Sequence, residues 1–95
     1  MAALWIAHVR VHDAEAYGRY AAEAGPAIAA HGGSFVARGA RYVQLEGPAR
    51  ERHVVARFPS LEAAEACYRS DAYQAALEHA RDAAERELVI VEIPD

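Results

Sequence analysis

The chain of 95 residues contains no lysine, and it has a single cysteine and a single tryptophan. Its ten basic residues are therefore all arginines. They are scattered along the chain and form no basic strip of the kind that binds nucleic acid, so we expect no nucleic-acid partner. The lone Cys67 excludes a disulfide within the chain and is typical of a reducing compartment. It lies in an alanine-rich stretch with helical spacing, where we expect a buried, unreactive thiol.

Long apolar runs are also missing from the chain. The first apolar stretch, Trp5 to Val11, is interrupted by His8 and Arg10, so it is typical of neither a signal peptide nor a membrane span. We therefore expect no membrane partner and a cytoplasmic location. The length predicts one domain over residues 1–95, and a domain this small buries only about two thirds of its unfolded surface. That limit favours self-association.

Four segments rich in Val, Ile, Phe or Trp are predicted strands, and stretches with helical spacing separate the first pair and the last pair. The predicted strands are Leu4 to Val11, Ser34 to Gly39, Arg52 to Phe58 and Glu87 to Ile93. The order β-α-β-β-α-β predicts an α+β fold, the ferredoxin-like plait. In this plait a four-stranded antiparallel sheet carries its helices on one face.

Capping residues and a proline set the expected helix limits. Asp13 predicts the start of the first helix, and Gly25-Pro26 predicts a kink or a break before the helix resumes to His31. Ser60 predicts the start of the second helical region. Ser70 predicts that this region bends or restarts there.

The period-two pattern of the strands assigns residues to the two faces of the sheet. The face opposite the helices is predicted to hold His8, Arg10, Arg38, His53, Arg57 and Glu92, mixed with Ile6, Val36, Val55 and Ile90. In the last strand, this assignment places Val89 and Val91 towards the core. A face with so many aliphatic residues is not typical of one that meets only water. A bulge near Gly39 would instead turn Arg38 to the opposite face.

No motif with a strong chemical signature is present, so no catalytic residue is assigned. The glycines lack phosphate-loop spacing, and the histidines never occur at metal-ligand spacing on one element. We expect no metal and no cofactor, with a site built from His8, His53 and Glu92 as the weaker alternative. His8 beside Arg38 or Arg57 would suit proton transfer on a small acidic or enolisable molecule. The favoured alternative is that these arginines have a structural role and not a catalytic one.

In the structural alternative, the arginines pair with Glu92 or Glu46 and secure a contact between subunits. The tyrosines also have either a structural role in the core or a role at a pocket. We expect Tyr17, Tyr20, Tyr68 and Tyr73 to pack at the rim of the core with their hydroxyls at its edge. One of them would border a cleft between helix and sheet.

Several short elements, in order and spacing, resemble the domain of unknown function 1330 (DUF1330) family. They include Asp13-Ala14-Glu15-Ala16-Tyr17, His31-Gly32-Gly33, Phe58-Pro59-Ser60-Leu61-Glu62-Ala63-Ala64 and Val89-Ile90-Val91-Glu92. The family looks like part of the dimeric α+β barrel superfamily, so the resemblance implies a homodimer in which two sheet faces meet. Backbone geometry and capping explain most matching positions. The pocket candidates are those left over, together with the polar groups of the open face: His8, Arg38, His53, Arg57, Glu46, Tyr17, Tyr68 and Tyr73.

Two functions from different classes fit this pattern, and whether the chain is an enzyme is left open. The first is a pocket for a small acidic or aromatic molecule, with cofactor-independent oxygenase or isomerase chemistry implied by the superfamily. It predicts a cavity with a histidine beside an arginine. The alternative is a non-enzymatic dimeric module, which predicts no cavity and fully paired arginines. A haem site with His8, His31 or His53 as axial ligand is a distant third hypothesis.

Overall fold

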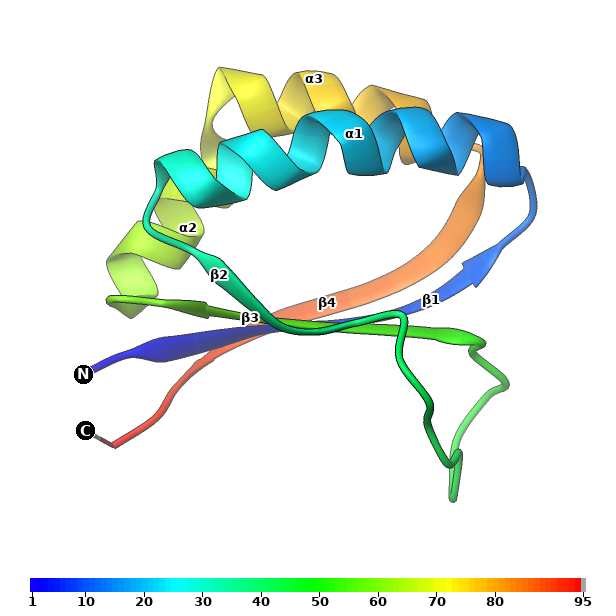
Figure 1. The fold of residues 1–95 in the computed structure, drawn as a ribbon, viewed down its shortest axis with the longest axis horizontal. Helices are drawn as coiled ribbons and strands as arrows, with labels where there is room; N and C mark the ends of the chain where they lie inside the picture. Colours follow the sequence, from blue (N-terminus) through cyan, green and yellow to red (C-terminus); the bar gives the residue numbers. More distant parts are fainter. Residues whose placement is uncertain (95) are drawn as a thin grey trace.

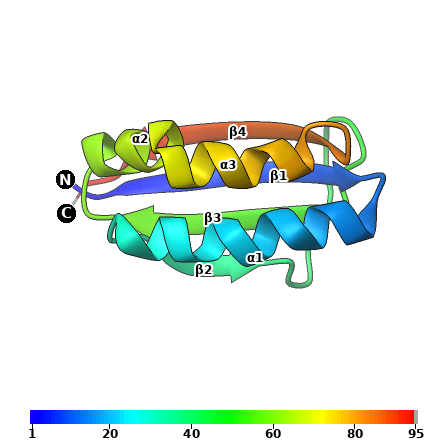
Figure 2. The same ribbon diagram turned by 90° about the horizontal axis from the view of Figure 1, so that it is seen from above.

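The computed structural model describes residues 1–94 and confirms the predicted α+β plait. The strands are β1 (Ala3–Val11), β2 (Ser34–Arg38), β3 (Arg52–Phe58) and β4 (Ala84–Glu92), and the helices are α1 (Ala14–Ala30), α2 (Leu61–Arg69) and α3 (Asp71–Ala80). The sheet order is β2-β3-β1-β4, and every neighbouring pair is antiparallel. The helices cover one face of the sheet (Figure 1 and Figure 2), and the loop between β2 and β3 extends beyond the opposite, open face (Figure 1).

The predicted capping residues begin all three described helices. The side chains of Asp13, Ser60 and Ser70 accept hydrogen bonds from backbone N–H groups three residues further on, at 3.1, 3.0 and 3.2 Å. Ser70 separates α2 from α3, which confirms the predicted restart. No helix among residues 1–94 combines the length and the apolar character that a membrane crossing requires.

Of the kink or break predicted at Gly25-Pro26, the break is wrong, because α1 continues through Pro26 to Ala30. Proline removes one intrahelical hydrogen bond, but the ring of Pro26 lies on the exposed side of the helix. The buried neighbours Ala24, Ala27 and Ile28 hold this part of the helix in the core. Burial of the apolar stripe therefore outweighs the local preference of proline.

The core lies between the sheet and the helices and is centred on Trp5, which is 1% exposed. Its indole packs against the rings of Phe58, Tyr68 and Tyr73, with centroids 5.6, 6.1 and 5.1 Å away. Cys67 is a free, buried thiol, as predicted, and burial raises its pKa to about 11. The thiol is therefore protonated and unreactive at neutral pH.

The pairing of β4 contradicts the predicted faces of that strand. Ile90 pairs with Trp5, so Ile90 and Leu88 lie on the helix-covered face. Val89 and Val91 lie on the open face and are 56% and 45% exposed. Either alternation of this segment is aliphatic, so its own pattern could not decide which face is buried.

Glu92 shares the error, because it pairs with Ala3 on the helix-covered side of the sheet. It therefore lies on the opposite side of the sheet from His8 and cannot join His8 and His53 in a metal site. No group of three or more His, Cys, Asp or Glu side chains that could hold a metal ion occurs within residues 1–94.

A bulge in β2 also overturns the predicted position of Arg38. The register with β3 shifts between Phe35 and Ala37, and beyond the shift Arg38 pairs with the core residue Val54. Arg38 consequently lies on the helix-covered face, and its guanidinium carbon is 4.2 Å from the centroid of the Phe35 ring. A bulge near Gly39 is the alternative that the sequence analysis left open, and it turns Arg38 to the opposite face as expected for that alternative.

Candidate functional site

The predicted site residues do not form one pocket, because they separate onto the two faces of the sheet. Arg38 and Tyr17 line a cleft beneath α1, on the helix-covered face. His8, His53 and Glu46 line a cup on the open face, against the loop between β2 and β3.

The remaining predicted residues join neither group. Arg57 shares the open face with His53, as predicted, but it lines a shallow depression near Ser34. Tyr68 lines grooves beside α2 and α3. Tyr73 is fully buried and does not line the cleft, although its hydroxyl contacts Tyr20 and Arg86, which line it.

The cleft beneath α1 is lined by three arginines that come from three strands. Arg38 lies on β2, Arg52 on β3 and Arg86 on β4, and aromatic side chains including Tyr17 and Phe35 fill the walls between them. The cavity has a volume of about 20 Å³, enough for about one water molecule. Helix α1 lies beside α3, and its buried side chains Tyr17, Tyr20, Ala24, Ala27 and Ile28 pack in the core between the helix and the sheet (Figure 1).

Arg86 is held in the cleft by two tyrosine hydroxyls. Its Nη2 donates to Tyr20 Oη at 2.9 Å and to Tyr73 Oη at 3.2 Å, and the two hydroxyl oxygens are 2.6 Å apart. The guanidinium carbon lies 4.8 Å from the centroid of the Tyr20 ring. The Nε atom of Arg86 is buried and has no hydrogen-bond partner. No carboxylate among residues 1–94 forms an ion pair with Arg86.

The protonation states of this group follow from burial. Burial raises the pKa of Tyr20 far above its usual value, with a further contribution from Tyr73. Burial also raises the pKa of Tyr73, although Arg86 opposes the effect. For Arg86, burial disfavours the charge, but the two tyrosines more than offset it and its pKa is raised. At neutral pH the group therefore consists of two neutral hydroxyls and one cation.

The other two arginines of the cleft also lack carboxylate partners within the described chain. The guanidinium carbon of Arg52 lies 5.7 Å from the centroid of the Tyr17 ring, and its Nε is buried without a hydrogen-bond partner. Arg38 donates from Nη2 to the backbone oxygen of Ala21 at 3.4 Å. Arg38 is exposed, whereas Arg52 and Arg86 are part-buried and have no counter-ion within the described chain, an arrangement that favours a bound anion.

We expect Tyr20 and Tyr73 to stay protonated above pH 10 for as long as the protein is folded. Tyrosine in an unfolded chain ionises near pH 10, and both folded pKa values are raised. Their contribution to stability is therefore complete below about pH 10 and is lost as the pH rises further. Absorbance at 295 nm with parallel circular dichroism measures both processes. Ionisation of all five tyrosines near pH 10 in a protein with native circular dichroism would contradict this expectation.

On the open face, His8 and His53 are cross-strand neighbours on β1 and β3. Their Nδ1 atoms are 2.8 Å apart. The Nε2 of His53 lies 3.0 Å from the backbone oxygen of Arg50, which can only accept, so His53 carries a proton on Nε2. In the neutral pair, the Nδ1 of His53 must then accept the Nδ1–H of His8. This leaves the Nε2 of His8 as a free acceptor.

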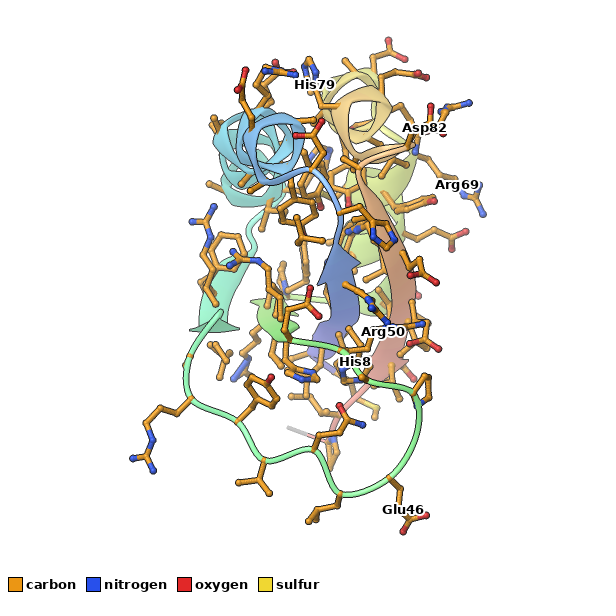
Figure 3. The ribbon with its side chains drawn as sticks, turned by 90° about the vertical axis from the view of Figure 1, so that its right-hand side faces the viewer. His8, Glu46, Arg50, Arg69, His79 and Asp82 are labelled. Carbon is orange, nitrogen blue, oxygen red and sulfur yellow. The ribbon has the colours of Figure 1, made fainter. Side chains whose placement is uncertain are left out.

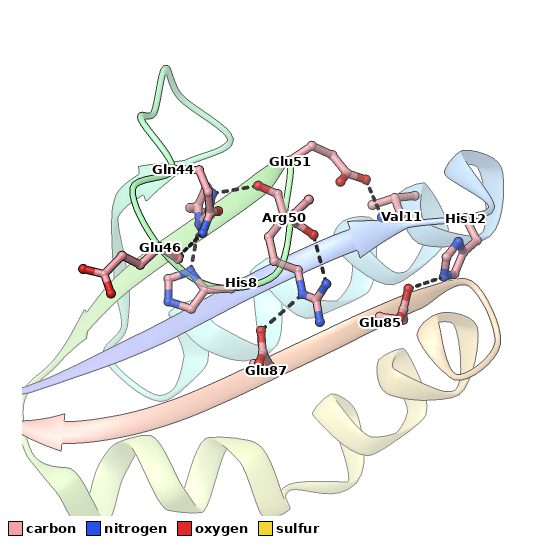
Figure 4. Close-up of polar contacts among 11 residues, drawn as sticks. His8, Val11, His12, Gln44, Glu46, Arg50, Glu51, Glu85 and Glu87 are labelled. Carbon is pink, nitrogen blue, oxygen red and sulfur yellow. Dashed lines mark hydrogen bonds and ion pairs between the residues drawn. The ribbon is translucent and has the colours of Figure 1, made fainter.

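The cup around His8 has a volume of about 620 Å³ and is formed by the sheet and the loop between β2 and β3 (Figure 4). Arg50 in this loop donates from Nε to Glu87 at 3.2 Å and from Nη1 to the oxygen of Ala49 at 2.9 Å. The ring of Tyr42 packs on the ring of His53, with centroids 4.7 Å apart. Figure 3 shows His8 and Arg50 on the side of the sheet that faces the loop, far from His79 on the helical layer.

Sequence reasoning missed Arg52 and Arg86 as site residues, although a signal for both was present. Arg52 has the same parity as the core residue Val54, and Arg86 has the same parity as Leu88. An arginine on the buried parity of a strand is unusual, since arginine is rarely found inside without a partner. The signal at Arg86 was concealed because the predicted strand began at Glu87, whereas β4 begins at Ala84, and because the faces of that strand were assigned wrongly.

Comparison with known proteins places this geometry in a family. A protein of unknown function from Rhodopseudomonas palustris is 26% identical, with a TM-score of 0.79 over 99% of this chain and 83% of that one. SnoaB, a cofactor-independent oxygenase from Streptomyces nogalater, is 13% identical, with a TM-score of 0.67 over 99% and 94%. A dimeric ferredoxin-like protein of unknown function from Thermobifida fusca is 18% identical, with a TM-score of 0.65 over 98% and 92%.

The last two likenesses concern the fold alone. The curated proteins contain no match. The family model described as "Domain of unknown function (DUF1330)" matches residues 2–94. The chain therefore belongs to the DUF1330 family.

Proposed function

We propose that the protein binds a small acidic aromatic molecule, in its anionic form, in the cleft beneath α1. The observation that carries this proposal is Arg86, a partly buried cation that is held by two neutral hydroxyls and has no carboxylate partner within residues 1–94. Arg52 lines the same cleft, and its buried Nε also lacks a hydrogen-bond partner within the described residues, while Arg38 adds an exposed cation to the lining. A bound anion would supply the missing counter-charge and would accept from the guanidinium groups.

The lining also defines the remainder of the ligand. The rings of Tyr17 and Phe35 and the indole of Trp5 offer flat apolar surface next to the cations, which suits an aromatic anion. The cavity of about 20 Å³ is too small for such a molecule, so α1 must move away from the sheet to admit it.

The chemistry that suits the cleft is stabilisation of an oxyanion. Cationic N–H groups and the neutral hydroxyl of Tyr20 favour the ionised form of a phenol, an enol or a carboxylic acid. No carboxylate or histidine lines the cleft, so the substrate must be acidic enough to ionise without a base from this site. Enolates and phenolates are electron-rich enough for isomerisation or direct oxygenation. Cofactor-independent oxygenase or isomerase chemistry is therefore our proposal, supported by the shared fold of SnoaB.

The non-enzymatic alternative predicts no cavity and fully paired arginines. Three arginines without carboxylate partners around one cleft favour the ligand-binding hypothesis instead. We also propose that the protein is a homodimer that pairs through the open face of the sheet. Aliphatic side chains of β1, β3 and β4 support this proposal, because Val89 and Val91 are exposed on the open face of β4.

Benzoate and its neutral analogue benzamide are expected to bind with different affinities. The chain has one tryptophan, and Trp5 lines both the cleft and the groove beside α2 that contains Arg69, so its indole N–H signal in an NMR spectrum reports on these two places. We expect benzoate to shift this signal at a concentration at least tenfold lower than benzamide requires. Arg52→Met is expected to weaken benzoate binding at least tenfold, because one uncompensated cation is removed.

Arg69→Met is the matched control for this titration. Arg69 is 71% exposed and pairs with Glu65 on α2, outside the cleft, so its loss should leave the titration unchanged. Equal affinity for benzoate and benzamide, or an Arg52→Met variant that binds benzoate as wild type does, would refute the anion site.

A further inference from the structure

We propose that the cup on the open face is a proton-transfer site for a neutral, enolisable carbonyl compound, with Nε2 of His8 as the base. This site lies on the opposite side of the sheet from the cleft, so it does not depend on the function proposed above. It uses the histidine pair and the loop between β2 and β3, which the anion site leaves unused.

The first step of the argument is the orientation of His8. A chain of two hydrogen bonds runs from the Nδ1–H of His8 to Nδ1 of His53, and from Nε2–H of His53 to the oxygen of Arg50. The backbone carbonyl at the end of the chain can only accept, so it fixes the direction of both hydrogen bonds. His53 thus acts as a positioning residue, and the basic lone pair of His8 is left on Nε2.

The second step is that this lone pair is free. Within residues 1–94, Nε2 of His8 makes no hydrogen bond, and His8 is exposed and lines a cup of about 620 Å³. A cup of this size accommodates a small organic molecule.

The third step concerns charge, which distinguishes the cup from the cleft. The guanidinium of Arg50 is already paired with Glu87, and the carboxylate of Glu46 lies at the same cup. The cup therefore has no uncompensated cation and does not favour an anionic ligand. The hydroxyl of Tyr42 has no hydrogen-bond partner within the described chain and can donate to a neutral carbonyl oxygen.

The reaction that follows is an isomerisation without a co-reactant. Nε2 of His8 takes a proton from the carbon next to the carbonyl group, and the C–H electron pair forms the carbon–carbon double bond of the enolate. The carbonyl π electrons move to the oxygen, which accepts the hydrogen bond of Tyr42. Return of the proton from His8, to the same carbon or to the oxygen, completes the exchange or the enolisation.

Hydroxyacetone in deuterium oxide is the probe, and proton NMR measures the exchange of its carbon-bound hydrogens. We expect the wild-type protein to accelerate this exchange at least tenfold over buffer, and His8→Gln to remove at least nine tenths of the acceleration. His79→Gln is the matched control, because His79 lies on the helical layer and is expected to leave the exchange unchanged (Figure 3). Circular dichroism verifies that each variant is folded.

A second measurement does not depend on the probe. Nitrogen-15 NMR of the imidazoles is expected to show His8 protonated on Nδ1 and His53 on Nε2, and His53→Phe should abolish the preference of His8 for Nδ1. Exchange no faster than in buffer, full acceleration in His8→Gln, or His8 protonated on Nε2 would each overturn the proposal. Arg52→Met should lose benzoate binding and keep the exchange, so the failure of either site is recognised separately.

Discussion

Arg86→Met is expected to weaken anion binding in the cleft at least tenfold while leaving the fold as stable as wild type or more stable. The guanidinium of Arg86 is partly buried, its Nε is unpartnered, and no carboxylate offsets its charge. Methionine has a similar length and removes the cost of withdrawing that charge from water. Tyr20 and Tyr73 keep their hydrogen bond to each other. We expect the free energy of unfolding to be unchanged or to rise by about 1 kcal/mol.

Two measurements on the same variant test this expectation. Urea unfolding gives the change in stability, and the benzoate titration followed at the Trp5 indole should weaken at least tenfold. Arg81→Met is the control, because Arg81 is 64% exposed and pairs with Glu78. A loss of about 3 kcal/mol or more in Arg86→Met would assign a structural role to the arginine. The proposed function would then lose the observation that carries it.

An Arg86→Met variant that is at least as stable as wild type would reflect a common compromise between stability and function. A site that binds an anion must hold positive charge where water is scarce, and the empty protein bears that cost. The fold limits the cost here by surrounding Arg86 with hydroxyls that accept hydrogen bonds and remain neutral. A carboxylate in their place would satisfy the cation better, but it would compete with the ligand.

The parts of the fold that could be predicted from the sequence are those with a local physical cause. Asp13, Ser60 and Ser70 cap helices because the side-chain oxygen of a capping residue can accept from the backbone N–H three residues further along the chain. β1 and β3 have one clearly apolar parity, so their faces were assigned correctly. His8 and His53 were therefore predicted on one face, where the structure brings their rings into contact.

The features that could not be predicted depend on partners distant in the sequence. β4 is aliphatic on both parities, and only its pairing with β1 decides that Leu88 faces the core. The bulge in β2 shifts Arg38 to the other face, and its position is set by the pairing with β3. Together these two effects divided the single predicted pocket into the cleft and the cup. Tyr42 was missed because the loop between β2 and β3 has no periodic pattern.

Val89→Asp is expected to convert the proposed homodimer into a monomer. The open face carries an aliphatic patch made by Ile6, Val55, Val89 and Val91, next to the cup. Val89 is 56% exposed in the single chain, so an aspartate there should not disturb the core. In a dimer that pairs this patch with its copy, each subunit would bury a carboxylate against apolar side chains. That burial costs several kcal/mol, so we expect the dissociation constant to rise at least a hundredfold.

Sedimentation velocity at micromolar concentration distinguishes the two states. The mass derived for the wild-type protein should be twice the 10.3 kDa mass of the chain, and the mass derived for Val89→Asp should be that of one chain. Ala22→Asp is the control, because it adds the same charge on the exposed side of α1 and should remain dimeric. A monomeric wild type would refute the pairing of sheet faces, and a dimeric Val89→Asp would place the interface elsewhere. Neither outcome would affect the cleft, because its arginines lie on the other side of the sheet and act within one chain.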